Sequence, residues 1–182
     1  LAIAKIPGIP GMPEATVKKY LGEARFLRAF YYFYLVRIFG DVPLITAPVN
    51  AQSPELYAPR TPVAAVYDQI VADLTEAESS DLPWRDATGR ASLGAVKSLL
   101  AEVYLTMAGF PLNKGASHYT LAANKAKEVI DNGTFSLFTD YDALHSTGTE
   151  NQGEHIFMVQ YAAGIADNNI QQRLLPNATD IS

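Results

Sequence analysis

Apolar side chains recur at three- and four-residue spacing in four stretches of the chain, which is the spacing of one helix face. This pattern predicts helices over residues 13–40, 61–78, 92–108 and 117–132. Proline is tolerated at the first position of a helix, and Pro13 stands there. Gly40, Gly109 and Gly133 stand where these helices should end, because glycine adopts the backbone conformation of a helix terminus. The pattern therefore predicts an all-α fold.

The first predicted helix is apolar on more than one side. One stripe consists of Tyr20, Ala24, Leu27, Tyr31, Tyr34 and Ile38, and a second consists of Phe26, Phe30 and Phe33. A helix that is apolar on most sides packs against several neighbours. We therefore expect the tyrosines on these stripes to lie in the core, as we also expect for Tyr67 and Tyr104 on later helices.

The segments between the helices carry strand-like runs and helix caps. Short strands are predicted at residues 42–46, 135–138 and 154–161. Thr61 and Pro62 read as the cap and the first residue of the second helix, and Ser92 reads as the cap of the third. Asp41 is expected to cap the turn that follows Gly40.

A set of residues in the first helix recurs at an offset of 72. The set Leu21, Gly22, Arg25, Leu27, Ala29 and Tyr32 is matched by Leu93, Gly94, Lys97, Leu99, Ala101 and Tyr104. This offset is about twice the 34-residue tetratricopeptide unit. It favours stacked helical hairpins over a closed bundle. The predicted fold class is thus all-α, a tetratricopeptide-like α–α superhelix with a few short strands.

Composition and charge exclude several classes of protein. The 182 residues are 48% hydrophobic, which suits one domain with a real core and excludes a disordered tail. Net charge is −5, and the basic residues of the first helix alternate with large apolar ones, so no basic face for nucleic acid is predicted. The uncharged run between Arg28 and Arg37 is eight residues long, against about 20 for a membrane-spanning helix. There is no cysteine, and hence no disulfide.

The stretch from Gly22 to Leu44 contains the strings GEARFLRAFYYF and LVRIFGDVPL. These strings resemble the signature of the SusD/RagB family, nutrient-binding outer-membrane lipoproteins of Bacteroidetes-type bacteria. Later motifs resemble the family in the same order: Arg60-Thr61-Pro62, Gly89-Arg90-Ala91, Ala101-Glu102-Val103-Tyr104-Leu105 and Glu154-His155-Ile156-Phe157. The resemblance covers the chain from about Pro13 to Gln160.

The resemblance implies a function and a place in the cell. It implies that residues 1–182 are part of a SusD/RagB-like helical-repeat domain. Residues 134–182 would then be the start of an irregular region. The expected function is to bind an extracellular nutrient, an oligosaccharide above all, and to hand it to a TonB-dependent SusC-like transporter. The expected location is the cell outer membrane, surface-exposed and lipid-anchored through an N-terminus that this chain does not contain. The alternative is a repeat scaffold that docks on the transporter while regions absent here hold the ligand.

Because part of the fold is then expected to be missing, some of residues 26–39 or of the C-terminal tail should be more exposed than in a complete domain.

Four residues are candidates for ligand contact. Trp84 and Arg85 lie in a predicted loop, and Tyr57 and Arg60 lie in a proline-rich connection. Loops on rigid scaffolds often carry function, and an aromatic face suits the apolar face of a sugar ring. By contrast, Arg25, Arg28 and Arg37 lie on a largely buried helix, and we expect them to pair with acidic residues.

The sequence offers little for catalysis. His118, His145 and His155 are far apart and form no recognised catalytic or metal-ligating motif. Asp140 with Asp142, and Glu150 with Glu154, are carboxylate pairs of the kind that glycosidases use, but such spacing is common. We therefore expect a binding protein rather than an enzyme, with no cofactor and no metal, and we retain a glycosidase as a third alternative.

Overall fold

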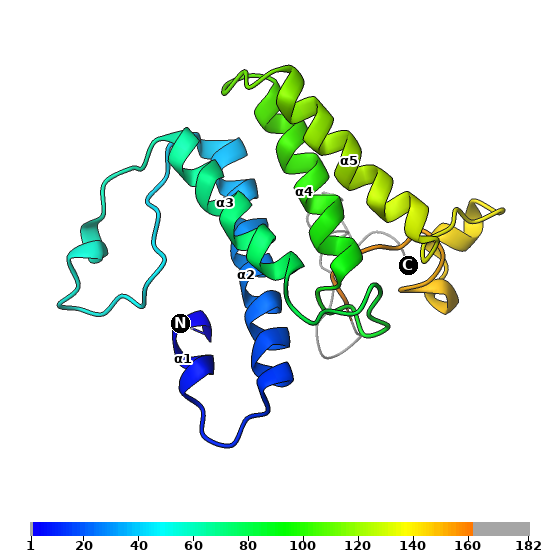
Figure 1. Cartoon of the computed structure of the whole chain (residues 1–182), viewed down its shortest axis with the longest axis horizontal. Helices are drawn as coiled ribbons and strands as arrows, with labels where there is room; N and C mark the ends of the chain where they lie inside the picture. The colour runs from blue at the N-terminus through cyan, green and yellow to red at the C-terminus, as the bar shows by residue number, and fades with distance from the viewer. Residues whose placement is uncertain (1, 162–182) are drawn as a thin grey trace, which may run out of the picture.

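The computed structural model describes residues 2–161, and these residues fold into helices joined by long connections (Figure 1). The α-helices are α1 (Ala2–Lys5), α2 (Glu14–Phe39), α3 (Val63–Glu78), α4 (Leu93–Ala108) and α5 (Ala116–Asn132). The 3-10 turns are η1 (Ile6–Gly8), η2 (Pro54–Tyr57), η3 (Asp142–His145) and η4 (Thr147–Thr149). The bounds of the four long helices lie within two residues of those that the apolar spacing predicts.

The long helices form two hairpins that stack side by side. Helix α2 packs against α3, α4 packs against α5, and α3 contacts α4 between them (Figure 1). This arrangement confirms the predicted stacked helical hairpins. In the part of the chain that the structure describes, no helix is both long and apolar enough to cross a membrane.

The core lies between α2, α3 and α4. Helix α2 turns its second stripe inward, so that Phe26 and Phe33 are almost completely buried, and Phe33 meets the buried Tyr67 edge to face. Helices α3 and α4 complete the core with apolar residues of their own: Val66, Ile70, Leu74, Ala77, Val96, Leu99, Leu100 and Val103.

The other stripe of α2 is exposed, which corrects the expectation that its tyrosines lie in the core. Tyr31 is 63% exposed, Tyr34 is 50% exposed and Ile38 is 67% exposed. Tyr20 is also exposed, whereas Tyr67 is buried as predicted. The reason is that α3 and α4 both pack on the phenylalanine side of α2. The greater exposure expected within residues 26–39 is confirmed, while the C-terminal tail lies outside the described residues.

The start of α3 is capped from a distance. The carboxylate Oδ1 of Asp41 accepts a hydrogen bond of 2.9 Å from the backbone N–H of Val63. The predicted cap at Thr61 is wrong, because Pro62 occupies the cap position and no side chain caps locally. Asp41 thus joins the end of α2 to the start of α3. The predicted cap of α4 is confirmed, since the hydroxyl of Ser92 accepts from the backbone N–H of Ala95 at 3.2 Å.

The expected short strands do not form a sheet. Over residues 2–161 the only β-type pairing is a single antiparallel bridge between Val42 and Thr61. The later extended segments pack on helices, and a backbone hydrogen bond of 3.3 Å from the N–H of Ser136 to the carbonyl of Gly153 joins their neighbourhoods. Phe157, for example, lies edge-on against the rings of Phe26 and Phe30, at centroid distances of 5.0 and 5.7 Å.

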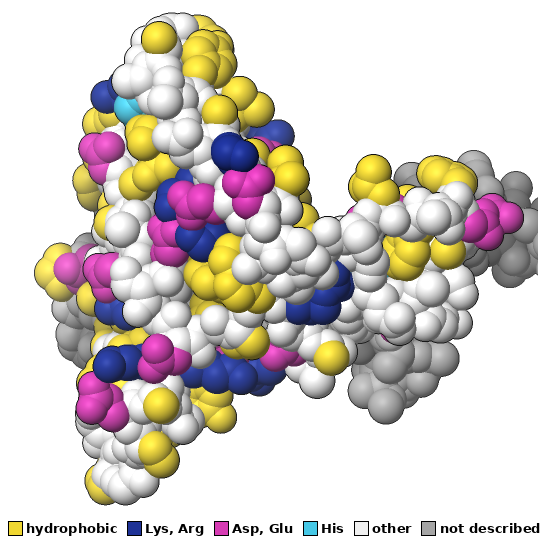
Figure 2. Space-filling model, turned by 45° about the vertical axis from the view of Figure 1, so that its right-hand side comes forward, with side chains coloured by type: hydrophobic (Ala, Val, Ile, Leu, Met, Phe, Trp, Pro, Cys, Tyr) yellow, Lys and Arg dark blue, Asp and Glu magenta, His cyan; other side chains and the backbone are white. Residues whose placement is uncertain are grey.

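Ion pairs tie α2 to its neighbours, as expected for its three arginines. The pairs are Arg25–Glu76 at 2.6 Å, Arg28–Asp73 at 2.6 Å and Arg37–Glu102 at 3.0 Å. On the face shown in Figure 2, basic and acidic side chains lie next to one another rather than gathering into a patch of one sign.

Candidate functional site

Tyr57 and Arg60 lie in the connection between α2 and α3, and they have different surroundings. Tyr57 ends the turn η2 on a protruding part of this connection and is 89% exposed (Figure 1). Arg60 instead donates hydrogen bonds to the backbone carbonyls of Phe39 and Asp41, at 3.4 and 3.0 Å. Its guanidinium therefore covers the end of α2, while Tyr57 presents its ring to solvent.

Trp84 lies in the loop between α3 and α4 and is half-buried there. Its backbone carbonyl accepts a hydrogen bond of 3.1 Å from the N–H of Gly94, at the start of α4. Its ring faces the ammonium group of Lys97, which lies 5.7 Å from the ring centroid. The backbone of Trp84 thus helps to begin α4, and the residue as a whole keeps partial contact with solvent.

Arg85 lies in the loop between α3 and α4 and binds the backbone of the segment that follows α5. Its guanidinium donates to four backbone carbonyls, those of Thr134 (2.9 Å), Asn151 (2.8 Å), Gly153 (2.6 Å) and His155 (3.2 Å). The guanidinium also lies over the ring of Phe135, 4.3 Å from its centroid. Burial lowers the pKa of Arg85, although an arginine still stays charged. Most of its donors are therefore committed to holding residues 134–155.

The four predicted ligand residues do not come together in one site. Tyr57 and Arg60 precede α3, whereas Trp84 and Arg85 follow it. Helix α3 has 16 residues, and at 1.5 Å per residue it separates the two pairs by about 24 Å. The four predicted residues thus lie in two separate regions of the structure, one at each end of α3.

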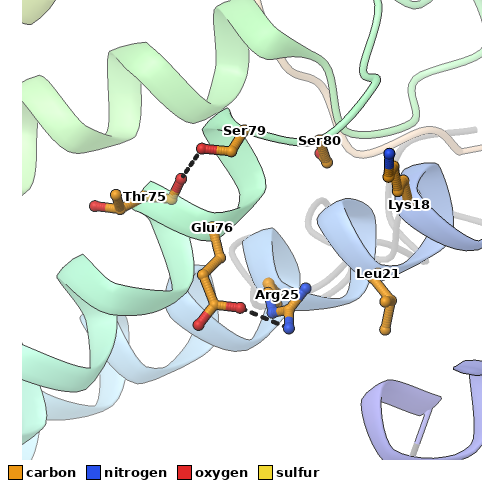
Figure 3. A pocket seen from close by; sticks show the side chains of 7 residues that line it. All are labelled: Lys18, Leu21, Arg25, Thr75, Glu76, Ser79 and Ser80. Atoms are coloured by element: carbon orange, nitrogen blue, oxygen red, sulfur yellow. Dashed lines mark hydrogen bonds and ion pairs between the residues drawn. The ribbon is translucent and has the colours of Figure 1, made fainter.

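A different group of side chains surrounds a hollow between α2 and the end of α3 (Figure 3). Its volume is about 330 Å³. Helix α2 contributes Lys18, Leu21 and Arg25. The last turn of α3 and the residues after it contribute Thr75, Glu76, Ser79 and Ser80. The hollow combines positive, negative, hydroxyl and apolar groups within one small space.

Charged groups on two sides of this hollow are paired. Arg25 Nη2 lies 2.6 Å from Glu76 Oε2, and Figure 3 shows the two side chains facing each other across the helices. Lys18 Nζ lies 2.9 Å from Glu14 Oε1, and this hydrogen bond raises the pKa of Lys18 and lowers that of Glu14. Both pairs retain contact with solvent, so a ligand could reach their polar atoms.

Only part of this hollow could be predicted from the sequence. The pairing of Arg25 with an acidic residue was expected, whereas no pattern singled out Thr75, Ser79 or Ser80. The available signal was the clustering of hydroxyl residues at the end of an amphipathic helix. That signal is weak, because such residues also serve simply to end helices.

A second hollow, of about 740 Å³, lies between the end of α5 and the segment that follows it. It is lined by Val129, Ile130, Phe135, Ser136, Leu137, Leu144, Glu154 and Ile156. Ser136 and Glu154 are the two polar side chains in this lining, and the others are apolar.

The structure shows no metal site among the described residues, since nowhere in 2–161 do three histidine or carboxylate side chains converge. Asp140, one of the candidate paired carboxylates, accepts a hydrogen bond of 3.1 Å from the backbone N–H of Asp142. That bond is a local turn contact.

Two stacked helical hairpins define a helical-repeat scaffold, and a small hollow lies between two of its helices. Residues 11–105 match the profile of a SusD-like family described as starch-binding and associating with the outer membrane. This match covers more than half of the chain. The chain therefore belongs to the SusD/RagB family, a family of carbohydrate-binding proteins of the outer membrane.

Individual relatives agree with this assignment. A SusD-like protein of Formosa agariphila is 30% identical over 96% of this chain and 34% of its own length. A crystal structure of a SusD superfamily protein from Parabacteroides distasonis is 46% identical, with a TM-score of 0.90 over 99% of this chain and 38% of that one. A laminarin-binding SusD-like protein is 33% identical, with a TM-score of 0.74 over 88% of this chain and 34% of that one. The chain thus spans about a third of the length of these relatives.

Proposed function

We propose that the protein binds an extracellular oligosaccharide and hands it to a TonB-dependent outer-membrane transporter of the SusC type. The observation that carries this proposal is the family match over residues 11–105, whose description is starch-binding and associating with the outer membrane. The structural likeness to a laminarin-binding protein supports a glucan as the ligand. The proposed location is the cell surface, with a lipid anchor at an N-terminus outside this chain.

We propose Trp84 and Tyr57 as the aromatic contacts of the ligand, with Arg85 and Arg60 beside them. Tyr57 is the better placed for stacking, because its ring is almost fully exposed on a protruding turn. Arg60 donates through Nη1 to carbonyls at the end of α2, and Arg85 donates to four carbonyls within residues 134–155, so each arginine holds the backbone close to a proposed aromatic contact. The proposed binding is reversible and involves no chemical reaction.

A second candidate function is docking on the transporter, with the ligand held by other regions. The exposed apolar stripe on α2 favours it, because Tyr31, Tyr34 and Ile38 together leave a large apolar surface open to contact. In this case the helical repeat would act as a scaffold between the transporter and the ligand-binding regions.

Titration calorimetry with laminarin, starch and xyloglucan oligosaccharides tests the first candidate. We expect binding that weakens about two- to tenfold when a stacking ring is removed in Trp84→Ala or Tyr57→Ala, since such a contact contributes about 0.5–1.5 kcal/mol beyond its area. Tyr119→Ala is the matched control, because Tyr119 is an exposed tyrosine on α5. Absence of binding heat with every glycan, together with co-purification with the SusC-type transporter, would favour docking on that transporter as the function.

A further inference from the structure

Two ion pairs join α2 to α3 one helical turn apart, and they differ in how far their carboxylates are buried. Arg28 binds Asp73 with two hydrogen bonds, of 2.7 and 2.6 Å, and Asp73 is buried. Arg25 Nη2 lies 2.6 Å from Glu76 Oε2, and the Glu76 side chain is 57% exposed. An arginine carries five N–H donors, and a carboxylate has two acceptor oxygens. The outer pair therefore keeps donors and acceptors side by side at the edge of the hollow.

The hydroxyl groups of the hollow present acceptors. Thr75 donates to the carbonyl of Val71 at 2.8 Å, and Ser79 donates to the carbonyl of Thr75 at 3.2 Å. Ser80 donates likewise to the carbonyl of Ala77 at 2.6 Å. A hydroxyl has one hydrogen and two lone pairs, so each oxygen can still accept a hydrogen bond. The end of α3 thus favours a ligand that donates several hydrogen bonds.

The charges around the hollow balance. Lys18 lies 2.9 Å from Glu14, and Arg25 lies 2.6 Å from Glu76, so each cation has its own acid. A charged ligand therefore meets no unpaired charge among the residues that line the hollow, and an uncharged ligand needs none. Leu21 adds an apolar wall on the α2 side. A neutral molecule with several hydroxyls and one apolar face fits this combination.

We propose that the hollow between α2 and α3 binds a single neutral sugar ring. Two neighbouring hydroxyls of the ring accept from Arg25 and donate to Glu76, while the C–H face of the ring rests on Leu21. The volume of about 330 Å³ is at the lower end of the range for ligand pockets, which is about 300–1,000 Å³, and so suits one ring rather than a chain. This inference rests on the proposed glycan-binding function and adds a subsite on the helical repeat itself.

The test is a titration of the full chain with methyl β-glucoside, followed through its backbone amide resonances. Concentrations up to about 100 mM reveal a dissociation constant in the millimolar range, which is weak binding of about −4 kcal/mol. We expect saturable shifts at Leu21, Arg25, Thr75 and Ser79. Glucuronate and glycylglycine serve as charged probes, and we expect both to bind more weakly than the glucoside.

Glu76→Gln keeps the size of the side chain and should weaken glucoside binding about tenfold or more, because a hydrogen bond to a charged group is lost. Glu102→Gln is the matched control. Glu102 lies on α4 and pairs with Arg37, which is on α2 like Arg25 but lies outside the hollow. The control should bind as the unmodified protein does.

Each outcome separates this inference from the proposed function. No shifts at the hollow, or tighter binding of glucuronate or of the dipeptide, overturns the neutral-sugar subsite. Oligosaccharide binding that is unchanged by Glu76→Gln, with no response to the glucoside, overturns the subsite and leaves the proposed function standing. Glucoside shifts at the hollow that Glu76→Gln removes support the subsite even if no oligosaccharide is bound elsewhere.

Discussion

Arg28 and Asp73 clamp the first hairpin of this protein. Nε and Nη2 of Arg28 donate to the two carboxylate oxygens of Asp73, which is 2% exposed. This hydrogen bonding raises the pKa of Arg28 against the opposing effect of burial. Arg28 Nη1 also donates to the carbonyl of Thr46 at 3.2 Å. One guanidinium therefore joins α2, α3 and the connection between them.

Removing one partner of this pair should be costly. In Asp73→Ala the arginine remains partly buried without its carboxylate, and we expect a loss of about 3–5 kcal/mol in the free energy of unfolding. Urea denaturation followed by circular dichroism measures it. Glu102→Ala removes an exposed partner of Arg37 and should cost less than about 1 kcal/mol. Equal losses in the two variants would show that the clamp at Asp73 is no stronger than a surface pair.

The sequence could predict that Arg28 needs an acid but not which one. Apolar periodicity identifies helices and their approximate ends, because it depends only on residues close in the chain. The partner Asp73 lies 45 residues away, and the cap that Asp41 provides for α3 spans 22 residues. Both depend on how the hairpin closes, which is a property of the tertiary structure.

The same limit explains the error on α2. Its two apolar stripes are similar in character, and periodicity cannot show which stripe meets α3. The structure buries Phe26 and Phe33 and leaves Tyr31 and Ile38 exposed. The hollow at Arg25 was missed for a related reason, since hydroxyl residues at a helix end have no signature that distinguishes a binding site from a simple terminus.

Gly22 and Gly94, which stand 72 residues apart, occupy matching places in the two hairpins. A Cβ on Gly22 would lie 2.0 Å from the hydroxyl oxygen of Ser80, in the chain just after α3. A Cβ on Gly94 would lie 2.5 Å from the ring of Phe135, just after α5, and 2.8 Å from the carbonyl oxygen of Trp84. The repeated glycine thus lets the chain after each second helix approach the first.

Gly94→Ala should therefore destabilise the protein, although alanine normally stabilises a helix relative to glycine by about 1 kcal/mol. The obstacle includes a backbone carbonyl and an aromatic ring, so we expect overpacking to cost about 1–3 kcal/mol. Thermal unfolding measures the change. Gly148→Ala is the control, because its added Cβ would lie 3.7 Å from the Ser146 hydroxyl oxygen, which is an ordinary van der Waals contact. A rise in melting temperature for Gly94→Ala would contradict the close approach.

Arg85→Met should loosen residues 134–155 without unfolding the helices. Methionine keeps much of the stem but removes the donors to four backbone carbonyls. Hydrogen exchange should then become faster over this segment, while amides of α2 and α3 keep their protection. Arg60→Met, which removes donors to the end of α2, is the comparison. Unchanged exchange combined with lost glycan binding would show that Arg85 acts on the ligand directly.

The contact between the two hairpins should depend on pH through Glu78, the last residue of α3, which pairs with Lys97 of α4 and Lys125 of α5. Burial tends to raise the pKa of Glu78, but hydrogen bonds from Lys125 and Lys97 outweigh it and lower the pKa. A carboxylate with a lowered pKa stabilises the fold above its unfolded value of about 4.3, and this contribution is lost as the pH falls through the folded value. The Lys97–Glu128 hydrogen bond lowers the pKa of Glu128 in the same way.

Lys97→Met tests this pH dependence, because Lys97 bonds to both Glu78 and Glu128. At pH 7 the variant should be less stable than the unmodified protein, and the difference should shrink as the pH is lowered from 5 to 3, where the carboxylates become protonated. Urea midpoints across this range measure the effect. Lys127→Met removes an exposed pair with Asp131 and should change stability little at any pH. A difference for Lys97→Met that stays constant down to pH 3 would show that lost packing, rather than charge, accounts for the role of Lys97.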